Sequence, residues 1–343
     1  MSPPRAGWRL SFFFALIFGL VATACRTSAS SSSSPSPTPS LAPSLAPSLG
    51  RPASPVASAP ASSSAATPSP PAERPAAATS PSPPLLYEVV TEGSRAHLFG
   101  TMHMGGDPDR DLHPVVWTRF AASPQVVLEA DLAGIDPAQM MARAQLPPGA
   151  SLSSMLRPDQ FAALRGALVS LPPGFQIDRL RPHVAMSLLV REMVPKTRPM
   201  DLVLQSRAAR AGKALAYLET VEAQMELLES AIDAEALGYS LDHLDEMRRR
   251  LGVMTEAYLR GDVAALEAAV FDPDEMAAQP EMFARIFKDR NEQWMKRLPE
   301  LMKGDAFVAV GAGHLLGSDG LVARLRARGH RVSRVVPAAA AAQ

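Results

Sequence analysis

The sequence predicts an α/β (α+β) domain in which a mixed central sheet, built from N- and C-terminal strands, holds a large helical middle region. Two observations between Leu85 and about Pro337, roughly 250 residues, support this prediction. Short apolar segments bounded by glycine, proline or charge lie near both ends and are typical of buried strands. Between them, apolar residues recur every three or four positions, which indicates helices. Strands at both ends with helices between them define the class.

The predicted strands are short and rich in apolar side chains. In chain order they are Leu85–Val90, Arg95–Phe99, Gln125–Ala130, Ala214–Leu218, Phe307–Val310 and Arg331–Val336. Thr91-Glu-Gly-Ser94 separates the first two strands, so we expect a hairpin with glycine in its turn.

The predicted helices fill the intervening sequence. They are Leu156–Ser170, Pro182–Val194, Leu202–Ala211, Val221–Glu235, Leu241–Leu259, Met282–Met302 and Leu321–Arg328. For the last helix, Ser318 or Asp319 is the expected N-cap, and Gly329 is expected to end it.

Residues 1–24 have the pattern of a secretory signal peptide. Arg5 and Arg9 precede an apolar run from Leu10 to Ala22, and small residues then lead to Cys25, the only cysteine of the chain. Small residues directly before a lone cysteine resemble a bacterial lipobox, although Ala22 stands where leucine is usual. We therefore expect Cys25 to be lipidated; a plain signal peptide with an incidental cysteine is the alternative.

The segment from residue 25 to 84 is predicted to be a disordered tether behind that anchor. Of the 59 residues after Cys25, 18 are serine, 15 proline and 13 alanine, and none is aromatic. Such a segment has too little apolar surface to offset the entropy of ordering itself. We assign residues 85–337 to one domain and residues 338–343 to a disordered tail.

The charge balance argues against nucleic acid as a partner. The chain has 34 basic and 34 acidic residues, but five arginines and only one glutamate lie in residues 1–84. The remaining 29 basic and 33 acidic residues give the domain a formal charge of about −4. A single cysteine also excludes a disulfide framework.

Two glycine–histidine turns are the main candidates for chemistry. Gly100-Thr-Met-His103 follows one predicted strand and Gly311-Ala-Gly-His314 follows another. Ligand sites of α/β sheets form just beyond strand ends. If the two strands are neighbours, His103 and His314 approach one point, and a carboxylate would complete a three-ligand metal site. A purely structural histidine is the alternative at His314.

Glu129 is the expected carboxylate, because it ends the apolar strand Val126-Val-Leu-Glu129. Asp131 is expected to point the same way, two residues further on. A metal ligand or general base is our interpretation of Glu129; an N-cap or salt-bridge partner is the alternative. Asp201 precedes a predicted helix as a possible N-cap, and Glu219 follows a predicted strand and faces the same cleft.

The chain resembles the TraB/PrgY/GumN family, which includes the Tiki-type metalloproteases and is similar to erythromycin-esterase-like and ChaN-like proteins. The resemblance is carried in order by LFGTMH (98–103), VVLEADL (126–132), PMDLVLQSRAARAGKALAYLETVEAQ (199–224), RNEQW (290–294) and FVAVGAGHLLGSDGLVARLRARGHRV (307–332). It implies a divalent metal (manganese, cobalt or zinc) held by His103, His314 and Glu129. It also implies that Arg290 and Asn291 support the site, and it matches Asp201 and Glu219.

The function that this resemblance implies is metal-dependent hydrolysis of a peptide, or of a small-molecule amide or ester, at the cell envelope. Metal-bound water would attack, Glu129 would act as ligand or general base, and Arg290 or Asn291 would stabilise the oxyanion. The alternatives are a non-catalytic haem- or metal-binding lipoprotein and a peptide-sequestering protein. We expect a lipid-anchored chain on the periplasmic or outer-membrane side, or a secreted one if the lipobox is not used.

Overall fold

The computed structural model describes residues 84–91 and 93–337, and within them it contains a six-stranded mixed sheet. The strands are β1 (Leu86–Thr91), β2 (Ser94–Thr101), β3 (Gln125–Leu128), β4 (Ala214–Tyr217), β5 (Phe307–Gly311) and β6 (Arg331–Arg334). Their order across the sheet is β4-β3-β5-β2-β1-β6. The predicted fold class and the six predicted strands are confirmed.

The central part of the sheet is parallel. β2 pairs with β5, β5 with β3, and β3 with β4, all in parallel, whereas β1 is antiparallel to both β2 and β6. The expected β1–β2 hairpin is confirmed, and Gly93 in its turn has a φ of +79°. Because β5 enters between β2 and β3, strands from distant parts of the chain end side by side at one edge.

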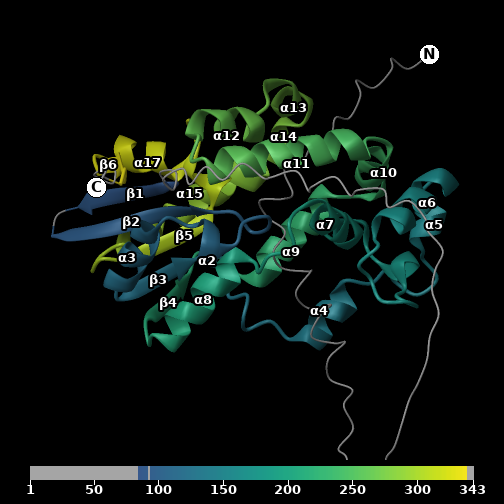
Figure 1. The fold of residues 1–343 in the computed structure, drawn as a ribbon, viewed down its shortest axis with the longest axis horizontal. Coiled ribbons are helices and arrows are strands. Elements are labelled where there is room, and N and C mark those ends of the chain that lie inside the picture. The colour runs from purple at the N-terminus through teal and green to yellow at the C-terminus, as the bar shows by residue number, and fades with distance from the viewer. Residues whose placement is uncertain (1–83, 92, 338–343) are drawn as a thin grey trace, which may run out of the picture. The chain divides into compact units, whose positions relative to one another are not determined.

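The helices from β2 to β4 include a group far from the sheet. They are α2 (Pro108–Asp111), α3 (Pro114–Ala122), α4 (Pro137–Arg143), α5 (Leu152–Met155), α6 (Pro158–Ala167), the 3-10 turn η2 (Ile177–Arg179), α7 (Pro182–Met193) and α8 (Met200–Arg210). Figure 1 shows α5, α6 and α7 at the end away from the strands, while α8 packs on β3 and β4.

The second helical region lies between β4 and β5. It contains α9 (Val221–Ala231), α10 (Ala234–Asp242), α11 (Leu244–Leu259), α12 (Val263–Val270), α13 (Pro273–Ala278), α14 (Pro280–Phe283), the π-helix η3 (Ala284–Asp289), α15 (Arg290–Trp294) and α16 (Leu298–Leu301). After β5 follow the 3-10 turn η4 (Ala312–Leu315) and α17 (Leu321–Ala327).

Three predicted helix boundaries are wrong. The helix expected at 221–235 ends at Ala231, because Asp233 caps a new helix by accepting from Ala236 N at 2.8 Å. The stretch 282–302 is not one helix; it changes to a π-helix and then breaks before α16. Neither Ser318 nor Asp319 caps α17, whose N-cap is Gly320, although Gly329 follows its end with a φ of +87° as expected.

Aromatic side chains fill the core beside the central strands. The Phe307 ring lies 5.8 Å from Phe99 and 5.4 Å from Phe120, centroid to centroid. All five residues of β5 are buried, as expected for a parallel strand covered on both faces. The central strands β2 and β5 are therefore buried among aromatic side chains.

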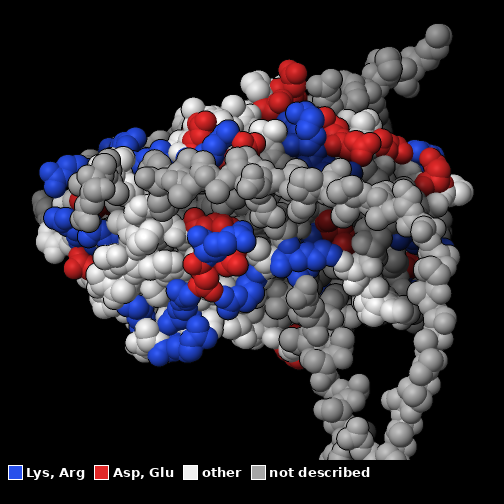
Figure 2. All heavy atoms as spheres, viewed as in Figure 1, with Lys and Arg blue, Asp and Glu red and all other residues white. Residues whose placement is uncertain are grey.

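Surface ion pairs tie the chain after β2 to α8. Asp109 on α2 pairs with both Arg198 and Arg207, and the Arg207 guanidinium lies 4.0 Å from the centroid of the Trp117 ring. Figure 2 shows acidic and basic side chains interspersed on this face around the position of α2. These contacts hold α2, which follows the loop that contains His103, against α8.

Candidate functional site

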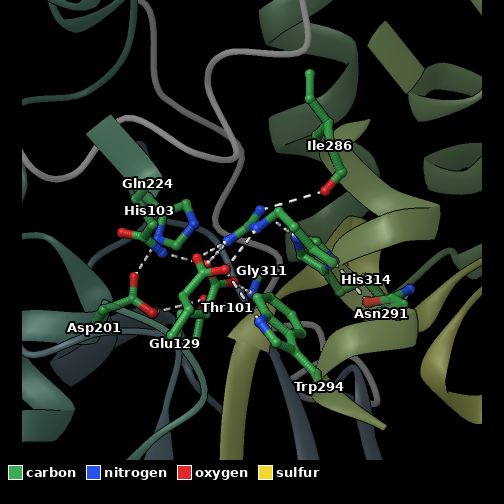
Figure 3. Close-up of polar contacts among 12 residues, drawn as sticks. Thr101, His103, Glu129, Asp201, Gln224, Ile286, Asn291, Trp294, Gly311 and His314 are labelled. Carbon is green, nitrogen blue, oxygen red and sulfur yellow. Dashed lines mark hydrogen bonds and ion pairs between the residues drawn. The ribbon is translucent and has the colours of Figure 1, made fainter. Parts of the chain in front are cut away.

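Four parallel strands end at one edge of the sheet, and each delivers a polar side chain there. Their order is β4, β3, β5, β2. Within three residues after these strand ends lie Glu219, Glu129, His314 and His103, which together span more than 200 residues of the sequence. The carboxyl edge of parallel strands is where α/β folds place their sites. The topology therefore assembles this cluster, and Figure 3 shows His103, Glu129 and His314 within it.

His103 forms a buried ion pair with Asp201 on the first turn of α8. Its Nδ1 is in close contact with Asp201 Oδ2, and Thr101 Oγ1 donates to Oδ1 of the same carboxylate at 3.0 Å. Burial disfavours the charged imidazole, but the Asp201 carboxylate outweighs it and raises the pKa of His103 above its usual value. Burial likewise opposes ionisation of Asp201, yet His103 holds the pKa of this carboxyl below its usual value. The expected N-cap role of Asp201 is wrong, since the N-cap is Pro199.

Glu129 is fixed by three donors from three different elements. Its Oε1 accepts from Gly311 N at 2.6 Å, and its Oε2 accepts from Gln224 Nε2 at 2.9 Å and from Arg290 Nη2 at 2.7 Å. Glu129 is thus a salt-bridge partner, which was one of the two alternatives open for it.

Arg290 lies at the centre of the cluster and is 8% exposed. Its Nη2 and Nε donate to the two oxygens of Glu219 at 2.6 and 3.1 Å, a bidentate pair. Its Nη1 donates to His314 Nε2 at 2.8 Å, and its Cζ lies 4.6 Å from the centroid of the Trp294 ring. Burial opposes the charge, but Glu129 and Glu219 raise the pKa of Arg290.

His314 is neutral, in contrast to His103. Arginine has no acceptor, so His314 Nε2 must accept from Arg290, and Nδ1 therefore carries the hydrogen that Asn291 Oδ1 receives at 2.8 Å. Burial, followed by the charges of Arg290 and His103, lowers the pKa of His314 well below its usual value. The rings of Trp294 and Phe287 cover this imidazole at 4.4 and 5.2 Å.

Asn291 fixes the loop after β5 as well as the imidazole. Its Nδ2 donates to His314 O at 3.2 Å and to Asp319 O at 2.9 Å. By helix position alone, Arg290 and Asn291 would be ordinary exposed residues, yet Asn291 is 1% exposed. Both lie directly after the π-helix η3, a feature that is frequent at functional sites. Their placement follows the resemblance rather than the helical pattern.

Asp131 does not join the cluster. β3 ends at Leu128, so the alternation that would have aimed Asp131 with Glu129 stops there. Asp131 Oδ1 instead accepts from Gln205 Nε2 at 2.5 Å and from Gly134 N at 3.0 Å.

A cleft of about 530 Å³ borders the cluster at Glu219. Asp131, Tyr217 and Arg297 line it together with α4 and the start of α9. A second cavity, about 410 Å³ in volume, borders the other side at Asn291 and Phe287 and is mainly apolar. Both volumes are in the range of small-molecule sites.

The side chains as placed do not fit a metal ion. Among the residues that the structure describes, no three His, Cys, Asp or Glu side chains converge on a point where they could hold one. His314 Nε2 and Glu129 Oε2 both accept from the Arg290 guanidinium. The arrangement supplies instead an imidazole whose pKa is raised, a guanidinium and three carboxylates in a buried cluster.

Three contributors to this cluster were not singled out from the sequence. Gln224 on α9 donates to Glu129, Thr101 donates to Asp201, and Trp294 Nε1 donates to Glu219 Oε2 at 3.1 Å. Thr101 lies two residues before His103, and Gln224 lies five residues after Glu219. Nearness to a strand end was therefore the available signal for these two, whereas Trp294 was marked only by its place in the RNEQW segment of the family resemblance.

This fold and site define an α/β domain with a buried, charged centre at the carboxyl ends of parallel strands. The model of the TraB/PrgY/gumN family matches residues 85–334, so the chain belongs to that family. Searches of curated proteins and of solved structures found no match.

The predicted signal peptide, Cys25, the C-terminal tail and all of the predicted tether except Pro84 lie outside the described residues. Within residues 84–91 and 93–337, no helix has both the length and the apolar character needed to cross a bilayer.

Proposed function

We propose that the chain hydrolyses amide or ester bonds of a peptide or small molecule at the cell envelope. The observation that supports this most is the His103–Asp201 pair, buried beside a cluster of charged groups that borders a cleft. No described residue is hydrogen-bonded to His103 Nε2, whereas Asp201 holds Nδ1. An imidazole oriented in this way is a general acid or base.

In the proposed reaction His103 carries the proton. Because its pKa is raised, the imidazole holds its proton more strongly than a free histidine, and it can donate this proton from Nε2 to the leaving amine or alcohol as water adds to the acyl carbon. Asp201 stabilises the charged form and fixes the ring. Hydrolysis should therefore fall as pH rises through the raised pKa of His103, and a pH–rate profile checks this sign.

Arg290 and Asn291 have positioning roles in this scheme. All three nitrogens of the Arg290 guanidinium donate to protein acceptors, and Asn291 Nδ2 donates to two backbone carbonyls. An oxyanion would have to replace one of these acceptors. Glu219, which lies between Arg290 and the cleft, is the member of the cluster nearest to a bound substrate.

The test is an amide and ester substrate panel with the full chain, assayed with added Mn²⁺, Co²⁺ or Zn²⁺ and with a chelator. We expect His103→Ala to abolish turnover, a loss of at least about 100-fold for an acid–base group. His243→Ala is the matched control, because His243 is exposed and its ring hydrogen-bonds, among the described residues, to Tyr239 O. Turnover by His103→Ala at the wild-type rate would refute the proposal. Comparing turnover with added metal and with chelator tests whether the reaction depends on a metal, as the family resemblance implies.

Peptide binding without turnover is the second candidate. It is favoured by the mutual satisfaction of Arg290, Glu129, Glu219 and His314, which leaves few groups free for chemistry. It predicts peptide binding in the cleft that survives His103→Ala and is not followed by cleavage.

Anchoring at the envelope is a further part of the proposal, through lipidation of Cys25. We expect labelled fatty acid to be incorporated by the wild-type chain and not by Cys25→Ser, with the variant released from the membrane fraction. Equal labelling of both chains would refute it.

A further inference from the structure

The position between His314 and Glu129 already contains a cation. Arg290 Nη1 is 2.8 Å from His314 Nε2, and Arg290 Nη2 is 2.7 Å from Glu129 Oε2. A metal ion bonds to imidazole nitrogen and carboxylate oxygen at about 2.0–2.2 Å. The single lone pair of His314 Nε2 already accepts from Arg290 Nη1, so an ion bound to that nitrogen would overlap Nη1. Metal and guanidinium therefore exclude each other here.

The guanidinium is also held from its other sides. Nε and Nη2 form the bidentate pair with Glu219, and Nη1 is 3.4 Å from Ile286 O in the preceding turn. The ring of Trp294 covers one face. Because Arg290 is buried, moving it away would leave two carboxylates without their cation in a region of low dielectric constant.

The surroundings of the two histidines nevertheless resemble those of metal ligands. His103 Nδ1 is held by Asp201 and His314 Nδ1 by Asn291, so Nε2 is the remaining nitrogen of each ring, and that of His314 contacts Arg290. Metal-ligating histidines are oriented through their second ring nitrogen in just this manner. The two histidines are thus oriented as in a metal site, although the cation beside His314 and Glu129 is the guanidinium of Arg290.

We propose that Arg290 is the resident cation of this centre and takes the place that a divalent metal would otherwise occupy. The native chain then binds no divalent metal through His103 and His314. Removing the guanidinium opens a site for a divalent ion that favours imidazole and carboxylate. This inference concerns occupancy and is independent of hydrolysis, so either can fail without the other.

The test is titration of the full chain with Co²⁺, followed by visible absorption and by calorimetry. Wild type should show no Co²⁺ binding that depends on His103 or His314. Arg290→Met, which keeps an apolar stem of similar length, should gain about one equivalent with d–d absorption bands. Adding His314→Ala to Arg290→Met should remove that gain.

Arg179→Met is the matched control. The Arg179 guanidinium donates to backbone carbonyls at 2.8 Å, and it does not belong to the cluster around Arg290. This variant should gain no Co²⁺ site. If Arg290→Met does not fold, Co²⁺ titration of the wild-type chain still tests the inference. Stoichiometric Co²⁺ binding by wild type that is lost in His103→Ala or His314→Ala overturns the inference, and its absence supports it.

Discussion

The two glycine–histidine turns have the same spacing and opposite electrostatics. His103 meets a carboxylate and its pKa is raised, whereas His314 meets an amide and a guanidinium and its pKa is lowered well below the usual value. Both imidazoles are almost fully buried, so burial alone does not separate them. Their partners separate them: Asp201 of α8 contacts His103, whereas Arg290 and Asn291 of α15 contact His314. A repeated motif can therefore specify position without specifying protonation.

Removing the Arg290 guanidinium should have the largest effect on this contrast. In Arg290→Met, Glu129 and Glu219 lose their shared cation, and breaking a buried ion pair from one side costs about 3–5 kcal/mol of unfolding free energy. His314 also loses its cationic neighbour, so its pKa should rise. Urea unfolding and histidine NMR titration measure the two effects. A variant as stable as wild type would contradict the central position of Arg290.

Asp201→Asn should make the two histidines alike in that both would have a lowered pKa. The amide keeps the size of Asp201 but removes the charge that outweighs burial, so the pKa of His103 should fall below its usual value. The loss of a buried charged hydrogen bond should cost about 1.5–3 kcal/mol. The variant should therefore lose the decline in stability that wild type shows as pH rises above the usual histidine pKa, and His103 should instead lower its stability as pH falls below that value. In wild type, a raised folded pKa stabilises the fold below the unfolded pKa, and this contribution is lost as pH rises through the folded value.

In wild type the same pair also limits stability in acid. Because the pKa of Asp201 is lowered in the folded state, its contribution is present above the unfolded pKa and is lost as pH falls through the folded value. Unfolding curves for wild type and Asp201→Asn at several pH values should therefore converge at both extremes. Parallel curves across the whole range would count against an ionised pair.

Gly313→Ala tests the close packing of the second turn. A Cβ at Gly313 would lie 2.6 Å from Phe287 Cε1, and the Phe287 ring contacts His314. Overpacking of this kind costs about 1–3 kcal/mol. Gly252→Ala is the matched control, because a Cβ there meets nothing within 4 Å in the middle of α11, and it should stabilise by about 0.5–1 kcal/mol. Thermal unfolding of both variants should show opposite shifts in Tm.

His183 on α7 shows what burial does without a charged partner at the ring. Its Nε2 is buried and unpaired, and burial lowers the pKa of His183 to about 4. Between the usual value and about 4 the unfolded chain binds more protons, so stability falls as pH falls, by up to about 2–3 kcal/mol. His183→Leu should flatten this acid limb. An unchanged limb in urea unfolding from pH 7 to 4 would assign the loss to other groups.

The sequence predicted the fold better than it predicted the site. Apolar segments such as Phe307–Val310 identify the strands, because burial on both faces needs such residues. Glu129, His103 and His314 were expected to approach one another from strand ends alone. Their partners could not be assigned in this way, since Asp201 and Arg290 reach the cluster from distant helices. The π-helix that precedes Arg290 cannot be predicted from the spacing of apolar residues along the sequence.

One glycine–histidine turn carries a histidine with a raised pKa, and the other carries a neutral histidine. Imidazole ¹⁵N NMR of the wild-type chain tests this contrast directly, because the shifts report both protonation and tautomer. We expect His103 to titrate above the usual histidine pKa, and His314 to remain neutral throughout with its hydrogen on Nδ1. If both residues titrate together, or if His314 carries its hydrogen on Nε2, then Arg290 does not donate to His314 and the account is contradicted.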